Sequence, residues 1–427
     1  MKDFSLFIKD LEKLISFKSV QAPAKDGMPF GEECYKALKF CLDRAEEMGF
    51  KTINYDGYAG EVVYGEGEEV GIMGHLDVVP TGIGWATDPF TLTFKDGAYY
   101  GRGILDDKGA TLMSLYALNA LKNSGIKPQR KFRMFFGTNE ESGWKDVDYL
   151  KTKTKLPEYG FSPDANFPLS YAEKGITVVE ITIPPLKKFS SIKGGTAINA
   201  VCDYATATAN SDAIDQTLLN KYNLKLVNGT TIESYGKAAH GSAPHLGKNA
   251  IKPLLEYMRD MGEDLDDVID NLFNDKQGIT KLNNEQGYVT FSPDLISVNQ
   301  KGEVVIKCDC RIPAPLSTAD IITLLDKTGL NYTTKINQPP VVVEKDGWLV
   351  KTLLSAFREV TGLQSEPISL GGSTFARAFN KGCAFGPALT KAKGNCHDAN
   401  EFMEENDLKT AYEIYEKAIF ALSKKQL

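Results

Sequence analysis

Two residues of the 427-residue chain, His75 and Asp77, have types and a spacing that suit metal chemistry. They follow a short apolar run that begins at Gly71 and is typical of a buried strand. Residues two apart on a strand point to the same face, so both side chains would leave the strand end together. An imidazole there can bind a metal ion while the carboxylate fixes its tautomer. A strand-end histidine hydrogen-bonded to a neighbouring aspartate is the plainer alternative.

Two adjacent aspartates, Asp106 and Asp107, stand where a glycine-containing turn leads into a helix rich in Leu and Ala. Gly101 and Gly103 suggest a dinucleotide-binding loop, whose third glycine would fall at position 106. A carboxylate there would face the pyrophosphate, so we reject that interpretation. Adjacent aspartates repel each other unless a cation or a helix-capping role offsets the repulsion.

A second acidic pair, Glu140 and Glu141, follows the apolar stretch 131–136, which we expect to form another buried strand. One glutamate could ligate a metal while its neighbour acts as general base on a metal-bound water. A solvated helix start is the alternative, because acidic side chains favour that end of a helix. A further aspartate, Asp164, has a turn-like setting. The chain has only four histidines: His75, His240, His245 and His397.

The composition is that of a globular protein for which we expect neither nucleic-acid nor membrane partners. A net charge of -7 and a pI of about 5.4 argue against a surface for nucleic acids or anionic membranes. No apolar run approaches the roughly 18 residues of a membrane span, and the charged N-terminus is unlike a signal peptide. The seven cysteines are scattered and odd in number, so we expect them to be reduced and the protein to be cytoplasmic.

The length predicts two domains, and the character of the sequence changes between about residues 176 and 340. The flanking parts read as α/β, with the segment 371–377 opening a further helix, and the middle part reads as an inserted α+β domain. The elements expected in the flanking parts are helices at 4–17, 32–48 and 347–361 and strands at 52–55, 61–64, 70–73, 131–136 and 382–385. Those expected in the insert are a strand at 176–183, a helix at 250–261, a hairpin of 295–298 with 303–311, and a helix capped by Ser317 and Asp320.

These motifs, in this order, resemble the di-metal hydrolases that include acetylornithine deacetylases, succinyl-diaminopimelate desuccinylases, aminoacylases and carboxypeptidase G. The similarity runs from about residue 10 to the C-terminus. Longer matches point to the PepV-type dipeptidase branch, namely the stretches at 75–80, 84–85 with 88–90, 106–109, 140–144, 161–164, 173–175 and 400–401, the last without an assigned role.

The resemblance implies an α/β fold with an aminopeptidase-like catalytic domain, a mixed sheet flanked by helices, at 1–177 and 344–427. The segment 178–343 would be an inserted α+β lid domain. PepV-type members use a double-size lid to work as monomers. We expect a monomer here, although this insert looks somewhat shorter than is usual in that branch.

The resemblance also assigns a metal-binding role to each motif. His75 and Asp164 would hold one divalent ion, Glu141 and His397 would hold the other, and Asp106 would bridge both. A set of two imidazoles and three carboxylates suits zinc, and also manganese or cobalt.

Other roles follow from the same resemblance. Asp77 would orient His75, and Glu140 would be the general base. The peptide bond between Asp106 and Asp107 is cis in the family, so we expect a cis bond here.

The insert would supply groups that recognise the substrate. His240 matches the lid histidine that donates to the oxyanion, and Asn199 matches a lid residue near the substrate. Arg311 matches the residue that binds the substrate's C-terminal carboxylate, for which a guanidinium fork is well suited. The same pocket would be lined by Ser373, Thr374 and Arg377.

The sequence therefore predicts a metallo-dipeptidase that cleaves small peptides with a free C-terminal carboxylate through a metal-activated bridging water. An N-acyl-amino-acid deacylase of the same family and a non-catalytic metal-binding relative are the alternatives. The presence of Glu140 and His240 argues against the second, since neither is needed merely to hold metal. Cys396 stands where this branch commonly has methionine, either as a packing substitution or as a thiol that alters the site.

Overall fold

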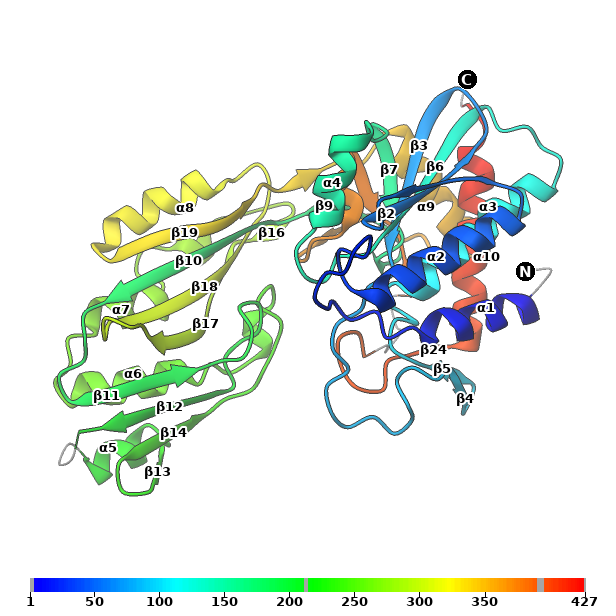
Figure 1. Ribbon diagram of the computed structural model, residues 1–427. Helices are drawn as coiled ribbons and strands as arrows, with labels where there is room; N and C mark the ends of the chain where they lie inside the picture. The colour runs from blue at the N-terminus through cyan, green and yellow to red at the C-terminus, as the bar shows by residue number, and fades with distance from the viewer. Residues whose placement is uncertain (1–3, 211–213, 390–394, 426–427) are drawn as a thin grey trace. The chain divides into compact units, whose positions relative to one another are not determined.

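The computed structural model describes residues 4–210, 214–389 and 395–425, which form two compact units (Figure 1). The first unit comprises Met1–Tyr171, Val342–Ile368 and Ser373–Leu427, and the second comprises Ala172–Val341 with Ser369–Gly372. Each unit has its own sheet and its own buried apolar residues. Among the residues described, no helix is long and apolar enough to cross a membrane.

The first unit is built on a mixed sheet. In order across the sheet, its strands are β1 (Lys51–Tyr55), β2 (Ala59–Tyr64), β6 (Arg130–Gly137), β3 (Glu68–His75), β7 (Tyr159–Ser162) and β22 (Lys381–Ala384), then the short β9 (Ser170–Glu173) and β20 (Val341–Val342), with β21 (Ile368–Leu370) paired to β9. Strands β6, β3, β7 and β22 are mutually parallel, whereas β1 and β2 add an antiparallel edge.

Strand β3 is a central strand of this sheet, and its last six residues, Val70 to His75, are all buried. A parallel strand covered on both faces requires such a continuous apolar run. Helix α3 (Lys108–Asn123) packs on β3 and is itself buried over most of its length. The ends of β3 and β6 therefore deliver His75 and the residues after Gly137 to one edge of the sheet, where α/β folds place their ligands.

Helices cover the first sheet. Helix α2 packs on β1 and β2, α4 packs on β2, and α10 packs on both α3 and α9. The helices not yet bounded are α1 (Phe4–Ser16), α2 (Glu32–Glu47), α4 (Lys145–Lys153), α9 (Trp348–Thr361) and α10 (Glu405–Leu422).

A small sheet ties the C-terminal segment to the start of α3. It contains β4 (Thr93–Lys95), β5 (Ala98–Tyr100) and β24 (Phe402–Glu404). Phe402 pairs with Tyr100 in the antiparallel β24–β5 ladder, and Gly101 donates a main-chain hydrogen bond of 3.1 Å to the oxygen of Glu401. This pairing brings the residues before β24 next to those before α3.

The second unit has an antiparallel sheet of eight strands. Their order is β13 (Lys225–Val227), β14 (Thr231–Tyr235), β12 (Tyr204–Ala209), β11 (Phe189–Gly194), β17 (Thr290–Val298), β18 (Val304–Ile312), β10 (Gly175–Ile183) and β19 (Asn331–Gln338). A single apolar cluster joins the sheet to its helices. Those helices are α5 (Gln216–Lys221), α6 (Ile251–Asp260), α7 (Asp266–Leu272) and α8 (Thr318–Leu325).

The predicted fold, an α/β catalytic domain with an inserted α+β domain, is confirmed. The capping box of Ser317 and Asp320 on α8 is also confirmed. The hairpin of β17 and β18 forms as predicted, although β17 already begins at Thr290.

The prediction of a helix opening at 371–377 was wrong. Only a 3-10 turn, Phe375–Ala378, follows Thr374, and Phe379 is already extended. Because the chain must enter β22 at Lys381, too few residues remain to pass the costly first turn of an α-helix.

Gly74 provides a test of the packing between β3 and α3. A Cβ at this position would lie 1.9 Å from Thr111 Oγ1 and 2.6 Å from Asp107 Oδ2. We expect Gly74→Ala to lower the free energy of unfolding by about 1–3 kcal/mol, as overpacked cores do. Urea unfolding measures this change. The control is Gly372→Ala, where the nearest atom to the new Cβ is 3.9 Å away; equal stabilities of the two variants would contradict the packing.

Candidate metal centre and catalytic residues

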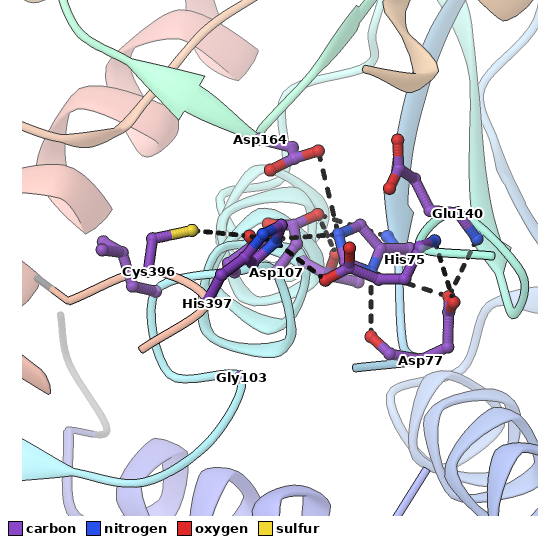
Figure 2. Close-up of polar contacts among 12 residues, drawn as sticks. His75, Asp77, Gly103, Asp107, Glu140, Asp164, Cys396 and His397 are labelled. Atoms are coloured by element: carbon purple, nitrogen blue, oxygen red, sulfur yellow. Dashed lines mark hydrogen bonds and ion pairs between the residues drawn. The ribbon is translucent and has the colours of Figure 1, made fainter. Parts of the chain in front are cut away.

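His75 ends strand β3 with its side chain buried. Its Nδ1 lies 2.9 Å from the main-chain oxygen of Asp77. A neutral ring that donates from Nδ1 to this carbonyl presents the lone pair of Nε2 on its other side. Nε2 lies 3.0 Å from Asp106 Oδ1 and 3.7 Å from Asp164 Oδ2 (Figure 2). The histidine is thus held in the tautomer that a metal ion would need.

The Asp77 carboxylate serves a second element. Its Oδ1 lies 3.6 Å from His75 Nδ1, while its two oxygens accept the main-chain N–H groups of Glu140 and Glu141 at 3.1 Å each. Figure 2 shows Asp77 below this turn and Glu140 above it. Asp77 therefore joins the end of β3 to the turn that carries both glutamates, a contact that its expected role toward His75 did not anticipate.

His397 approaches Asp106 from the opposite side to His75. Its Nε2 lies 3.0 Å from Asp106 Oδ2 and 3.2 Å from Glu141 Oε1. Each oxygen of Asp106 thus faces a different imidazole, as a residue bridging two ions would. With Asp164 beside His75, the structure brings all five predicted ligands together.

Negative charge is concentrated in this buried place. Burial, and after it the charge of Asp106, raises the pKa of Asp164 well above its usual range, and it raises that of Glu141 as well. Asp106 shifts the other way: although burial opposes it, hydrogen bonds from His397 and His75 hold its pKa well below the usual range. Cations relieve such repulsion. Three largely buried carboxylates with one buried and one half-exposed imidazole therefore fit divalent ions such as zinc or manganese.

Asp106 and Asp107 are joined by a cis peptide bond, as predicted. Asp107 is fully buried and points toward β3, where its Oδ2 accepts the main-chain N–H of His75 at 3.2 Å and the hydroxyl of Thr111 at 2.9 Å. Asp107 therefore anchors the first turn of α3 to the strand end that carries a predicted ligand.

Glu401 is a positioning residue for which the sequence predicted no role. It is fully buried and pairs with Arg102 at 2.8 Å. Its carboxylate also accepts the main-chain N–H groups of Gly103, Leu105 and Asp106. One side chain from the C-terminal segment thus shapes the turn that presents the bridging aspartate.

Cys396 lies against a predicted ligand. Its Sγ is 2.7 Å from Asp106 Oδ2, the oxygen that His397 also contacts, and Figure 2 shows Cys396 beside His397. Ligand atoms of Cys396, Asp106 and His397 all lie within 4.8 Å of one another. The thiol is therefore part of the site's surroundings.

The three substrate residues expected in the insert belong to the second unit. Nδ1 of His240 accepts the main-chain N–H of Ser242 at 3.1 Å, so the neutral ring carries its proton on Nε2. Ala200 and His240 form an isolated β-bridge, and the oxygen of Asn199 accepts the N–H of Gly241 at 2.7 Å. Asn199 and His240 are therefore neighbours in one loop pair.

Arg311 is almost fully buried on β18. Its Nε donates to both oxygens of Asp309 at 2.9 Å, and its Nη1 donates to the oxygen of Gly371 at 3.3 Å. Within the described part of the chain, Nη2 makes no hydrogen bond. The guanidinium is thus oriented with one nitrogen left for a ligand.

The remaining predicted pocket residues belong to the first unit. The hydroxyl of Thr374 accepts the N–H of Ala376 at 3.1 Å and caps the 3-10 turn. Ser373 immediately precedes it, and Arg377 lies within the turn. The structure gives Thr374 a local structural task, and the substrate roles of these residues stay predictions.

Comparisons with known proteins bear on this geometry. The profile of peptidase family M20/M25/M40 matches residues 71–421. The chain is 31% identical to a putative dipeptidase, YtjP, of Bacillus subtilis, with 98% of this chain and 97% of the relative covered. It is 32% identical to a Beta-Ala-Xaa dipeptidase of Lactobacillus delbrueckii subsp. lactis, with 98% and 96% covered. The fold matches the YXEP protein of Bacillus subtilis, a dinuclear metal binding peptidase, with a TM-score of 0.54, 12% identity and 98% of each chain covered.

Replacing Glu401 tests its positioning role. Glu401→Gln removes the charge that Arg102 faces in a buried place, and it weakens the turn before Asp106. We expect metal affinity to fall about 10- to 100-fold, the usual cost of losing a group that positions a ligand, as measured by competition with a chelating dye. The control is Glu405→Gln, on the first turn of α10. Unchanged affinity in Glu401→Gln would contradict the role.

Asp146 predicts how stability depends on pH. It is buried at the start of α4 and accepts the N–H groups of Thr138 and Asn139. Burial, and after it the charge of Asp77, raises the pKa of Asp146 to about 7. The unfolded chain loses this proton near pH 4. Stability contributed by Asp146 therefore falls as the pH rises from about 4 to about 7, by at most about 1.4 kcal/mol per pH unit.

Urea unfolding of the metal-free protein and of Asp146→Asn across pH 5 to 8 isolates this contribution. The stability of wild type minus that of the variant should decrease up to about pH 7 and then level off. A difference that rises with pH would show that the folded protein holds Asp146 ionised.

Proposed function

Because the chain belongs to peptidase family M20/M25/M40, we propose that it is a metal-dependent dipeptidase acting on small peptides with a free C-terminal carboxylate. The observation that carries this proposal is the turn held by Asp77. It sets Glu141 beside Asp106 and His397, and it leaves the adjacent Glu140 outside the five ligands. A ligand and a proton acceptor side by side are what hydrolysis requires.

The donor set supports a pair of divalent ions. His75 and Asp164 would hold one and Glu141 and His397 the other, with Asp106 between them. Zinc suits this mixture of imidazole and carboxylate best, and manganese or cobalt would also be accepted. When bound, such a pair polarises the scissile carbonyl and supplies a nucleophile at neutral pH.

The side chains of this protein then perform the remaining tasks. Glu140 takes a proton from the attacking water and returns it to the leaving amine. His240 donates from Nε2 to the carbonyl oxygen as negative charge develops there, and Arg311 binds the substrate's carboxylate through Nη2, the nitrogen left for a ligand. Contacts along the substrate would come from Asn199, Ser373, Thr374 and Arg377.

The same proposal includes a cytoplasmic, monomeric enzyme. No disulfide joins the cysteines within the described ranges, which suits a reducing compartment. The second unit buries a large apolar cluster of its own, so its fold does not depend on a partner subunit.

Replacing Glu140 tests the assignment of the base. In the metal-reconstituted enzyme we expect Glu140→Gln to lower kcat for dipeptides by about 10²- to 10⁴-fold, the usual contribution of general base catalysis. Metal content, measured by elemental analysis, should stay at the wild-type level. The matched control is Glu141→Gln, which should lose metal. If Glu140→Gln keeps its activity, the base is another group.

A substrate panel separates the proposed activity from its neighbours. Mixed dipeptides are compared with N-acetyl and N-succinyl amino acids in the presence of zinc, manganese or cobalt. Cleavage of dipeptides supports the proposal, whereas turnover of acyl amino acids alone would make the protein a deacylase. No turnover with any metal would favour a non-catalytic metal-binding protein.

A further inference from the structure

Two buried aspartates in the second unit take no part in the proposed chemistry. Asp294 lies in β17 and Asp309 in β18, and their exposures are 0% and 1%. The β17–β18 register shifts between Pro293 and Leu295, so Asp294 sits at an irregularity that re-aims its side chain. The hydroxyl of Ser292 donates to Asp294 Oδ1 at 2.5 Å. The other oxygen, Oδ2, is buried and has no hydrogen-bond partner within the described residues.

Asp309 contacts the predicted carboxylate receptor. Asp309 and Arg311 are two residues apart on one strand, so their side chains share a face. Both oxygens of Asp309 accept from Arg311 Nε at 2.9 Å. This contact occupies Nε of the guanidinium and thereby fixes the direction in which Nη1 and Nη2 point.

The same two carboxylates lie under the turn that carries His240. A Cβ at Gly241 would be 2.3 Å from Asp309 Oδ2 and 3.1 Å from Asp294 Oδ2. Only glycine allows the main chain to approach so closely. Gly241 also donates its N–H to the oxygen of Asn199, so the turn and the Asn199 loop rest on one support.

We propose that Asp309 and Asp294 are positioning residues for substrate recognition: Asp309 aims Arg311, and the two carboxyl groups together seat the Gly241 turn that presents His240. The proposal rests on the proposed function. It makes the receptor for the substrate carboxylate and the oxyanion donor parts of one assembly that rests on two buried carboxyl groups. A change in the assembly therefore alters selectivity for free carboxylates through Arg311 and turnover through His240.

The charges of this assembly are balanced by one proton. Two buried carboxyl groups lie near a single guanidinium, and burial raises the pKa of both, which favours the neutral form of one of them. Burial, with the charge of Asp309 adding to it, raises the pKa of Asp294 to about 8. Asp294 therefore keeps its proton at neutral pH, and Asp309 forms the ion pair with Arg311.

Kinetics with a dipeptide and its C-terminal amide test the role of Asp309. The ratio of kcat/KM for the free acid to that for the amide should fall about tenfold in Asp309→Asn, mainly through the KM of the acid, because a charge-assisted contact is lost. Asp294→Asn should keep the ratio within about twofold of wild type, since Asn mimics a neutral carboxyl group. Asp266→Asn, whose side chain is 80% exposed, is the control. An equal loss on both substrates in Asp309→Asn would overturn the proposal.

Gly241→Ala tests whether the turn that carries His240 rests on the two carboxyl groups. This variant also keeps the proposal testable if Asp309→Asn does not fold. The added methyl group should displace His240 and lower kcat for both substrates about tenfold or more with little change in KM, as loss of an oxyanion donor does. An unchanged kcat would overturn the proposal.

Infrared spectroscopy tests the proton without needing activity. At pH 7 the protonated carboxyl absorption of Asp294→Asn should be weaker by one group than that of wild type and of Asp266→Asn, since other buried carboxyl groups such as Asp146 contribute to the same band. Equal protonated carboxyl absorption in Asp294→Asn and in wild type would overturn the proposal. If wild type hydrolyses neither substrate, the proposed function fails. The infrared comparison then still shows whether Asp294 is the protonated member of the pair with Asp309.

Discussion

The repulsion between buried carboxylates is the constraint on which the first unit depends. Asp106, Glu141 and Asp164 are brought together where water is scarce, and burial raises the pKa of two of them. Two imidazoles partly offset this by flanking Asp106. Cations bound at the proposed ligands would relieve this repulsion, and metal binding would then add to the stability of the folded site.

Main-chain N–H groups hold the site in place. Asp77 accepts hydrogen bonds from the N–H groups of Glu140 and Glu141. Asp146 accepts from the two residues just before Glu140, and Glu401 accepts from the turn before Asp106. Each carboxylate binds two or more donors, and those of Asp77 and Glu401 come from segments remote in sequence. Main-chain hydrogen bonds to these carboxylates therefore help to set the geometry of the proposed metal centre, as precise catalysis demands.

How much of this was predictable depended on the range of each interaction. His75 and Asp77 could be paired because strand periodicity is local, and the ligand motifs could be recognised because residue types in a fixed order carry the resemblance. The task of Glu401 could not be foreseen, because its partners lie nearly 300 residues earlier in the chain.

Two other features were beyond sequence reasoning for related reasons. The contact of Asp294 and Asp309 with Gly241 exists only once three separate segments have met. The helix expected at 371–377 does not form because the chain must enter strand β22 at Lys381, which leaves room only for a 3-10 turn. Local periodicity predicts where helices and strands form, but it does not predict the conformation of the segments that connect them.

The order of segments along the chain has a consequence for synthesis on the ribosome. The first unit is assembled from three stretches, and its last stretch supplies both His397 and Glu401. A nascent chain that ends before these residues already contains the whole second unit, yet it lacks one of the five proposed metal ligands and the carboxylate that accepts the N–H groups of Gly103, Leu105 and Asp106. The second unit can thus fold during translation, whereas the metal centre can close only after nearly all of the polypeptide has been made.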